Sequence, residues 1–130
     1  MPFDNVNFVP SAALELLRRA HQRLMKGWIQ RHLSRMIWNP DEHIMGFCIL
    51  GSIRCNDAGV EMCVTDHMRE AEAWLRTTYE EQVGEGRLVA DRDIVEFNDH
   101  AGRTQEEVVA LVGKALSRME AHERMHSVVG

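Results

Sequence analysis

The segment 44–53 (IMGFCILGSI) contains no charged residue and is apolar on every side. Because it offers no face to water, we expect it at the centre of the hydrophobic core. It is much shorter than the roughly 20 residues that a membrane-spanning helix requires. Its pattern suits either a buried helix or a buried strand. Two glycines that permit close backbone approach, and the spacing of Cys48 and Cys55 by two helical turns, favour the helix.

Two further segments combine helical spacing of apolar residues with signals at their ends. The first begins at Ser11, a residue type that caps helices, and weakens at Gly27. The second is predicted over residues 65–82, and the glycine-containing segment 84–86 ends it. Each helix therefore presents one apolar face to a common core.

A third amphipathic helix is predicted to follow Thr104, because Thr104 and Glu107 fit the capping-box pattern. Residues 93–97 (DIVEF) are expected to form a short extended segment. With the central apolar segment, these elements predict a mainly all-α fold, a compact bundle of about four helices.

A chain of 130 residues is expected to form one domain, since two separate cores of this size would each be marginally stable. No internal repeat or linker-like segment divides it. We expect residues 1–9 to form an irregular N-terminal arm and residues 10–126 to form a single helical domain.

The three cysteines, Cys48, Cys55 and Cys63, are an odd number in a chain whose first residues do not resemble a secretory signal. Reduced thiols in the cytoplasm are therefore expected rather than a disulfide framework. No association with a membrane is expected.

Charge is divided unevenly along the chain, whose net charge is -5. Residues 1–40 carry six basic and two acidic side chains, whereas residues 41–130 carry nine basic and eighteen acidic ones. Arg18, Arg19 and Arg23 could bind nucleic acid or an acidic partner. Alternatively, the first helix docks against the acidic remainder. The second interpretation is favoured, because the overall charge repels phosphate and no aromatic residues alternate with the arginines.

Cys48, Asp99 and His100 supply the residue types of a nucleophile, a base and a group that orients the base. This set would make the chain a small cysteine-dependent hydrolase or transferase. A nucleophilic cysteine needs partial exposure and electropositive surroundings, whereas Cys48 lies in the most apolar segment. A cysteine there usually packs as a small hydrophobic side chain, so catalysis stays the alternative hypothesis.

The H-E-x-x-H pattern of zinc peptidases occurs at His122, Glu123 and His126. We expect no metal there, because a chain with seven histidines matches so short a pattern easily by chance. The end of a helix is also a poor support for rigid ligands. The three cysteines with His43 or His67 lack C-x-x-C spacing. No phosphate-binding or dinucleotide-binding motif occurs, so no cofactor is expected.

Asn98 and Asp99 stand shortly before the helix predicted after Thr104. Side chains of these types commonly close turns with nearby backbone groups. The functional alternative places both in a pocket beside Trp28 and Cys48.

Four short fragments are spaced along the chain, and they resemble the pattern of a family of small uncharacterised bacterial and phage domains. The fragments are Gly27-Trp28, Cys48-x-x-Gly51-Ser52-Ile53, Phe97-Asn98-Asp99, and Arg103-Thr104 with Glu107-Val108 and Leu111. The resemblance spans about residues 12–120. Phe97 stands where tryptophan is more usual, and Ser52 where alanine is usual. The resemblance implies a mostly helical fold and a bacterial or phage setting, in the cytoplasm of the bacterium or the infected host. It assigns no activity.

These observations predict a small non-enzymatic interaction or regulatory protein that binds another macromolecule. A protein is the expected partner, a homo-oligomer such as a homodimer is one form of the assembly, and an inhibitor of a host defence system would suit the profile. The alternatives are the cysteine-dependent enzyme and a nucleic-acid-binding module that uses the basic first helix. The residues expected to bind are Arg18, Arg19, Arg23, Trp28, Asn98 and Asp99.

Overall fold

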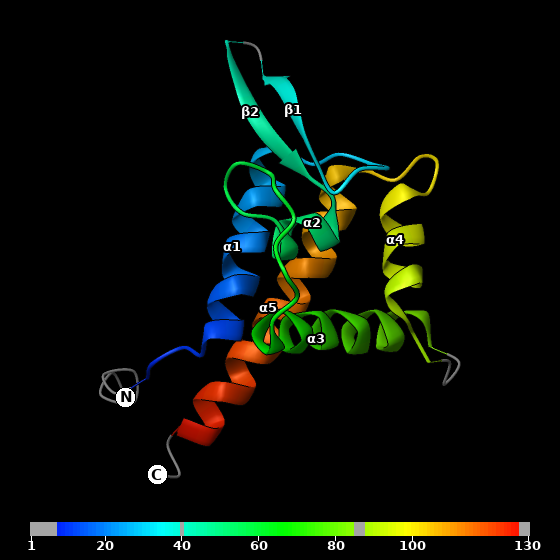
Figure 1. Cartoon of the computed structure of the whole chain (residues 1–130). Coiled ribbons are helices and arrows are strands. Elements are labelled where there is room, and N and C mark those ends of the chain that lie inside the picture. Colours follow the sequence, from blue (N-terminus) through cyan, green and yellow to red (C-terminus); the bar gives the residue numbers. More distant parts are fainter. Residues whose placement is uncertain (1–7, 40, 85–87, 128–130) are drawn as a thin grey trace.

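The computed structural model describes residues 8–39, 41–84 and 88–127, and these form five helices and one two-stranded antiparallel sheet (Figure 1). The predicted all-α bundle of four helices is therefore wrong, although helices dominate the fold. Of the expected arm over residues 1–9, residues 1–7 lie outside the described residues. In chain order, the elements are α1 (Ala12–Lys26), β1 (Ser34–Asn39), β2 (Glu42–Phe47), α2 (Ile49–Arg54), α3 (Asp66–Val83), α4 (Asp91–Asp99) and α5 (Gln105–Ser127).

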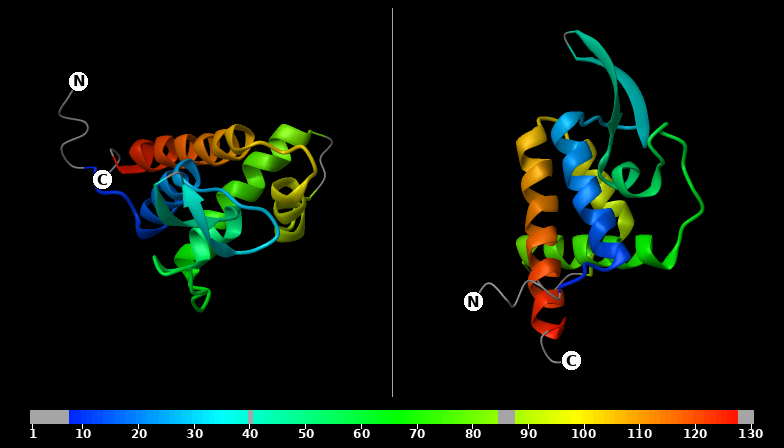
Figure 2. Two further views of the ribbon diagram at one scale, coloured as in Figure 1. Left: turned by 90° about the horizontal axis from the view of Figure 1, so that it is seen from above. Right: turned by 90° about the vertical axis from the view of Figure 1, so that its left-hand side faces the viewer.

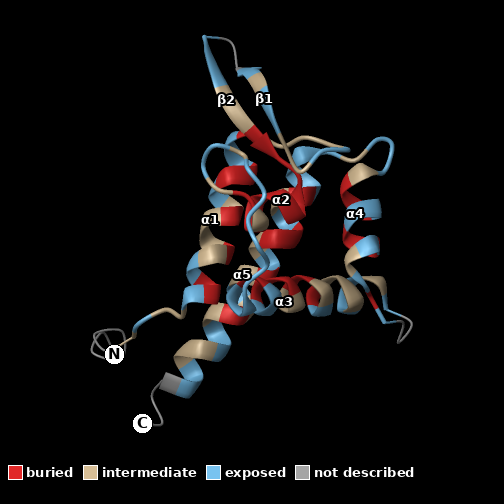
Figure 3. Ribbon diagram, in the orientation of Figure 1, coloured by how far each residue is buried: buried red, intermediate tan, exposed pale blue. Residues whose placement is uncertain are grey.

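The long helices α1 and α5 lie side by side, and α3 crosses them near one end (Figure 2). The short helix α2 packs against α1, α3 and α4 near the middle of the molecule. Figure 3 shows buried residues gathered on the inner faces of these helices. The fully buried side chains include Leu14, Leu17 and Leu24 of α1, Ile49 and Ile53 of α2, Leu75 of α3, and Val108, Val112 and Met119 of α5.

The apolar segment 44–53 forms neither one helix nor one strand. It is a strand up to Phe47 and a helix from Ile49, with Cys48 as the N-cap residue between them. The strand extends to Phe47 because its backbone is held by an additional partner. The Phe47 N–H donates to the Gly27 carbonyl at 2.9 Å, and the Phe47 carbonyl accepts from the Ile29 N–H at 3.1 Å. The preference for a continuous helix here is therefore corrected, while the Ile49–Ile53 part does lie in the core.

The β1–β2 hairpin projects from the helical body (Figure 1). Its register pairs Met36 with Met45, Ile37 with Ile44, and Trp38 with His43. Directly opposed residues share a face of a sheet, so Ile37 and Ile44 lie together. Their Cδ1 atoms would come within 3.1 and 3.2 Å of a Cβ at Gly27, so this face packs on the end of α1. The face with Trp38 and His43 points away from that contact.

The extended segment expected near residues 93–97 is wrong, because these residues lie inside α4. The Asp93 carboxylate accepts a hydrogen bond from the Ala90 N–H at 2.8 Å, which stabilises the first turn of the helix. Ile94 and Phe97 recur at helical spacing and are buried. The spacing of these two side chains outweighs the strand preference of Ile94 and its neighbour Val95.

The predicted caps at Ser11 and Thr104 are confirmed, and Thr65, predicted as the start of its helix, is the N-cap residue of α3. The Ser11 hydroxyl accepts from the Leu14 N–H, and the Thr65 hydroxyl accepts from the Met68 N–H. At α5, the Thr104 hydroxyl accepts from the Glu107 N–H at 3.2 Å, and the Glu107 carboxylate accepts from the Thr104 N–H at 2.9 Å. Within the described part of the chain, no helix is both long enough and apolar enough to cross a membrane.

Candidate functional site

Asn98, in the last turn of α4, holds three separate parts of the chain together. Its side chain is 1% exposed. The amide oxygen accepts hydrogen bonds from Trp28 Nε1 at 2.8 Å and from the Ile49 N–H at 3.1 Å. The amide nitrogen donates to the Ile29 carbonyl at 3.1 Å and to the Asp99 carboxylate at 2.9 Å. The buried amide is therefore well satisfied, which makes this contact specific as well as stabilising.

Asp99 fixes the loop between α1 and β1. Its Oδ1 accepts from the Arg31 N–H at 2.8 Å, and Arg31 adopts a positive φ of 71°. That conformation costs a residue other than glycine about 1 kcal/mol or more, so the hydrogen bond offsets part of the cost. The Gln30 side-chain amide donates hydrogen bonds from Nε2 to the carbonyl oxygens of Asn98 and His100, both at 3.0 Å.

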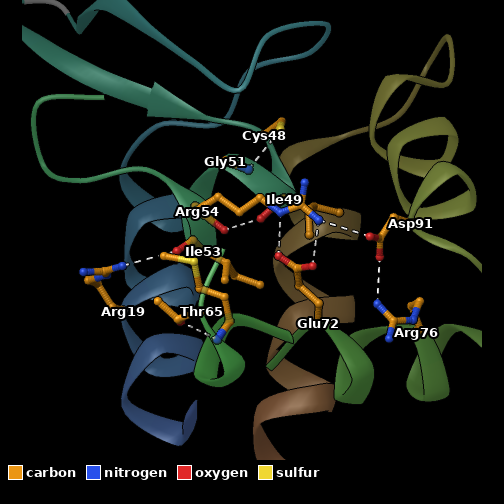
Figure 4. Close-up of polar contacts among 12 residues, drawn as sticks. Arg19, Cys48, Ile49, Gly51, Ile53, Arg54, Thr65, Glu72, Arg76 and Asp91 are labelled. Carbon is orange, nitrogen blue, oxygen red and sulfur yellow. Dashed lines mark hydrogen bonds and ion pairs between the residues drawn. The ribbon is translucent and has the colours of Figure 1, made fainter. Parts of the chain in front are cut away.

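Cys48 lies beside these residues with its thiol directed to the start of α2 (Figure 4). Its Sγ accepts from the Gly51 N–H at 3.3 Å, and the residue is 8% exposed. Burial raises the pKa of the Cys48 thiol above its ordinary value, and the nearby Asp99 carboxylate raises it further. At neutral pH the sulfur is therefore a protonated cap of α2. We call Trp28, Cys48, Ile49, Asn98 and Asp99 the Asn98 junction.

A small pocket of about 140 Å³ opens at the Asn98 junction. Cys48, Asn98 and Asp99 line it, together with Arg31, His32 and apolar side chains of α2 and α4. Trp28 joins through its hydrogen bond to Asn98. At roughly 30 Å³ per water molecule, the pocket holds a few waters or one small apolar group.

His100, the third residue of the catalytic set considered with Cys48 and Asp99, is not among the residues that line this pocket. It is exposed, and its Nδ1 lies 2.8 Å from the carbonyl of Ala101. The structure places His32 and Arg31 at the pocket instead, and neither residue was predicted there from the sequence. Their position depends on the turn at Arg31, whose positive φ has no glycine or asparagine to signal it.

The fragments that carry the family resemblance converge on this region. The Cα of Gly51 packs directly against the Leu33 carbonyl. A Cβ at this position would lie 1.8 Å from the carbonyl oxygen, so the contact requires glycine. Arg103 donates from Nε to the Phe97 carbonyl at 2.7 Å, and its guanidinium lies 3.8 Å from the centre of the Phe97 ring. The pattern therefore describes one packed junction that joins α2, α4 and the end of α1.

Two of the three α1 arginines that were expected to bind a partner, Arg18 and Arg23, form ion pairs with other parts of this chain. Arg18 bonds Glu120 at 2.6 Å, an interaction that raises the pKa of Arg18 and lowers that of Glu120. Arg23 is buried and donates to the carbonyls of Ser52 and Cys55 as well as to Asp57. These contacts agree with a first helix that docks against the rest of the chain. Arg19, the third of them, has a different environment.

The residues of the two metal hypotheses have other contacts in the structure. The His122 ring lies 5.3 Å from Trp74 and 4.1 Å from the His126 ring, while Glu123 accepts hydrogen bonds from the N–H and hydroxyl of Ser11. Cys55 is buried and Cys63 is exposed. Over the described ranges, no three histidine, cysteine, aspartate or glutamate side chains are grouped closely enough to hold a metal ion.

The end of the hairpin presents a different kind of surface. Trp38 is 71% exposed and Met36 is 52% exposed, and the Trp38 ring packs on His43 at a centroid distance of 3.8 Å. We call Met36, Trp38 and His43 the hairpin tip. Two of its three side chains are apolar, they project from a pair of hydrogen-bonded strands, and they are largely open to solvent.

Comparison with known proteins finds one family match. The model of a family of unknown function, DUF6197, matches residues 9–118. No curated protein and no solved structure matches the chain.

Proposed function

The chain belongs to the family of unknown function DUF6197, and we propose that it is a small non-enzymatic interaction protein, of bacterial or phage origin, which binds a partner protein through the hairpin tip. The observation that carries the proposal is the exposure of Trp38 at the end of a hairpin that projects from the helical body (Figure 1). Tryptophan is the residue type most enriched among the side chains that dominate binding energy at protein interfaces.

The geometry of the hairpin tip supports this role in two ways. Trp38 is stacked on His43 across the strands, so its ring loses little rotational freedom when it is buried by a partner. Met36 lies two residues away on the same face of β1 and enlarges the apolar surface with a flexible side chain. The matching surface is an apolar pocket, wide enough for an indole ring, on another protein.

The competing functions find less support in the contacts of their residues. The α1 arginines proposed for nucleic acid include Arg18 and Arg23, whose guanidiniums are engaged by groups of this chain. Burial keeps the Cys48 thiol protonated, and its Sγ accepts a hydrogen bond from the Gly51 N–H. A buried, protonated thiol is a poor nucleophile. Neither surface offers the exposed apolar area that the hairpin tip offers.

The test is site-specific photo-crosslinking followed by affinity measurement. A photoreactive amino acid at position 36 is expected to capture one partner protein, and the same group at position 88 is the control because Leu88 is also highly exposed. With the purified partner, Trp38→Ala is expected to weaken binding at least about tenfold, while Leu88→Ala leaves it unchanged.

Three results would contradict the proposal. The first is capture at position 36 no greater than at position 88, and the second is equal affinity of the wild type and Trp38→Ala for the captured protein. The third is a cross-link found only between two copies of this chain, which would identify a homodimer in place of a separate partner.

A further inference from the structure

A groove of about 630 Å³ lies between α1 and the segment that leads from α2 into α3, on a part of the molecule separate from the hairpin tip. Its apolar wall includes Leu16 of α1, Met62 of the connecting segment and Met68 of α3. Its polar groups include Arg19 and Thr65, which Figure 4 shows near α2. A volume of this size is typical of sites for small organic molecules.

Arg19 differs from its neighbours on α1. Arg18 and Arg23 each bond a carboxylate, whereas no described residue forms an ion pair with Arg19. Its Nη2 makes one long hydrogen bond, 3.4 Å, to the Ile53 carbonyl. Its Nε is the buried side-chain polar atom that lacks a hydrogen-bond partner among the described residues. Burial lowers the pKa of Arg19 and the nearby positive charge of Arg23 lowers it further, while the negative charge of Asp57 opposes both effects only in part.

The first turn of α3 meets the groove on the other side. Thr65 is the N-cap residue of this 18-residue helix, and His67 and Met68 follow in the groove wall. The N-terminus of a helix carries a partial positive charge and free N–H donors, which favour an anion. The Arg19 guanidinium and the start of α3 both line the groove, and the exposed Asp66 carboxylate in the first turn of α3 already forms an ion pair with Arg69.

The surroundings decide which anion fits. Glu15 also lines the groove, so its negative charge would oppose a multiply charged phosphate, although Glu15 itself bonds Arg18 at 3.1 Å. Apart from the imidazole ring of His67, the wall is made largely of aliphatic and thioether side chains, which adapt to a flexible chain. One positive group beside an aliphatic wall suits a single carboxylate on an alkyl chain.

We propose that this groove binds a medium-chain fatty acid. The carboxylate bonds the guanidinium of Arg19 and faces the N-terminus of α3, and the alkyl chain lies along Leu16, Met62 and Met68. Binding supplies the direct ion pair that Arg19 does not form with any described residue, since Asp57 acts on Arg19 only through its electrostatic field.

The test is a titration of the full chain with decanoate, kept below its micelle concentration and followed by calorimetry and by backbone amide NMR. We expect saturable binding, with the largest shifts at Arg19, Thr65 and Met68. Arg19→Gln is expected to weaken binding at least about tenfold, since a charge-assisted hydrogen bond is lost. Lys26→Gln is the matched control, because Lys26 is an exposed cation of the same helix outside the groove.

Two further arms separate the carboxylate contact from general hydrophobic binding. Met62→Asp, at a half-exposed position, is expected to weaken decanoate binding through charge repulsion and keeps the test valid if Arg19→Gln does not fold. Decanol, which has the same chain without the charge, is expected to bind at least about tenfold more weakly. The proposal is overturned if the wild type shows no saturable binding. Equal binding of decanoate and decanol, or unchanged binding in both groove variants, would also overturn it.

Discussion

The Asn98 junction and the hairpin tip each contain a tryptophan, and they use it in opposite ways. Trp28 is half-buried and donates its indole N–H to Asn98, whereas Trp38 leaves most of its ring in solvent. At the junction, backbone and side-chain groups from three parts of the chain satisfy one another. At the tip, the sheet holds the side chains in place and leaves their surface unused. The comparison teaches that the same residue type can hold the fold together where its polar group is paired, and leave a surface open where its ring is exposed.

The largest loss of stability is expected from Gly51→Ala. A Cβ at Gly51 would stand 1.8 Å from the Leu33 carbonyl oxygen, so the backbone of α2 or of the loop before β1 must move. We expect the free energy of unfolding to fall by at least about 3 kcal/mol in urea denaturation. Gly113→Ala is the control, because there the new Cβ meets only the flexible His21 ring at 3.1 Å and a change of at most about 1 kcal/mol is expected. Equal effects would show that the α2 contact is not tight.

Asn98→Ala is expected to cost nearly as much. It leaves the Trp28 and Ile49 N–H groups and the Ile29 carbonyl without their partner. The expected loss is about 2 to 3 kcal/mol in the same measurement, because buried polar groups without partners are costly. Asn98→Asp replaces the donating amide nitrogen by a carboxylate oxygen that faces the Asp99 carboxylate and the Ile29 carbonyl, so its loss should be at least as large as that of alanine. A loss below about 0.5 kcal/mol for Asn98→Ala would show that the hydrogen bonds of Asn98 do not stabilise the fold.

Thiol chemistry gives the next comparison. Cys63 is exposed and Cys48 is buried with a raised pKa, so a thiol reagent at neutral pH should label Cys63 at least about tenfold faster, as followed by mass spectrometry. Because the pKa of Cys48 is raised on folding, its contribution to stability is present below the unfolded pKa of about 8.5 and falls as the pH rises through the folded value. Stability in Cys48→Ala should accordingly decline less at alkaline pH than in the wild type. Rapid labelling of Cys48 would favour the cysteine-dependent enzyme instead.

The smallest effect on stability is expected at the hairpin tip. Trp38→Ala removes a largely exposed ring, so the free energy of unfolding should change by no more than about 0.5 kcal/mol. Thermal and urea denaturation measure this change. A loss above about 2 kcal/mol would show that Trp38 supports the fold, and its exposure would then no longer argue for recognition.

Much of the helical framework could be predicted from the sequence, because its signals are local. Ser11, Thr65 and Thr104 cap helices through residues three positions away, and apolar periodicity follows directly. The hairpin could not be predicted in this way. The pairing of β1 with β2, and of Phe47 with the chain beyond α1, depends on contacts between segments. These contacts divide one apolar run between a strand and a helix.

The candidate site shows the same limit. Placing Asn98 and Asp99 in a pocket with Cys48 could be inferred from residue types, and the geometry brings these three together. His100 is one residue beyond α4, so the helix end turns it away from the pocket. Arg31 and His32 enter through a turn with positive φ at an arginine. That turn is held by Asp99, far along the chain, and it has no local signal.

The central claim is that Trp28 and Asn98 form one energetic unit, and a double-mutant cycle on the free energy of unfolding tests it most directly. The cycle compares the wild type, Trp28→Phe, Asn98→Ala and the double variant. The account predicts that the sum of the two single-variant losses in the free energy of unfolding exceeds the loss in the double variant by about 1 to 2 kcal/mol. Either change alone removes the same hydrogen bond between Trp28 and Asn98. Additive losses, with a coupling near zero, would contradict it.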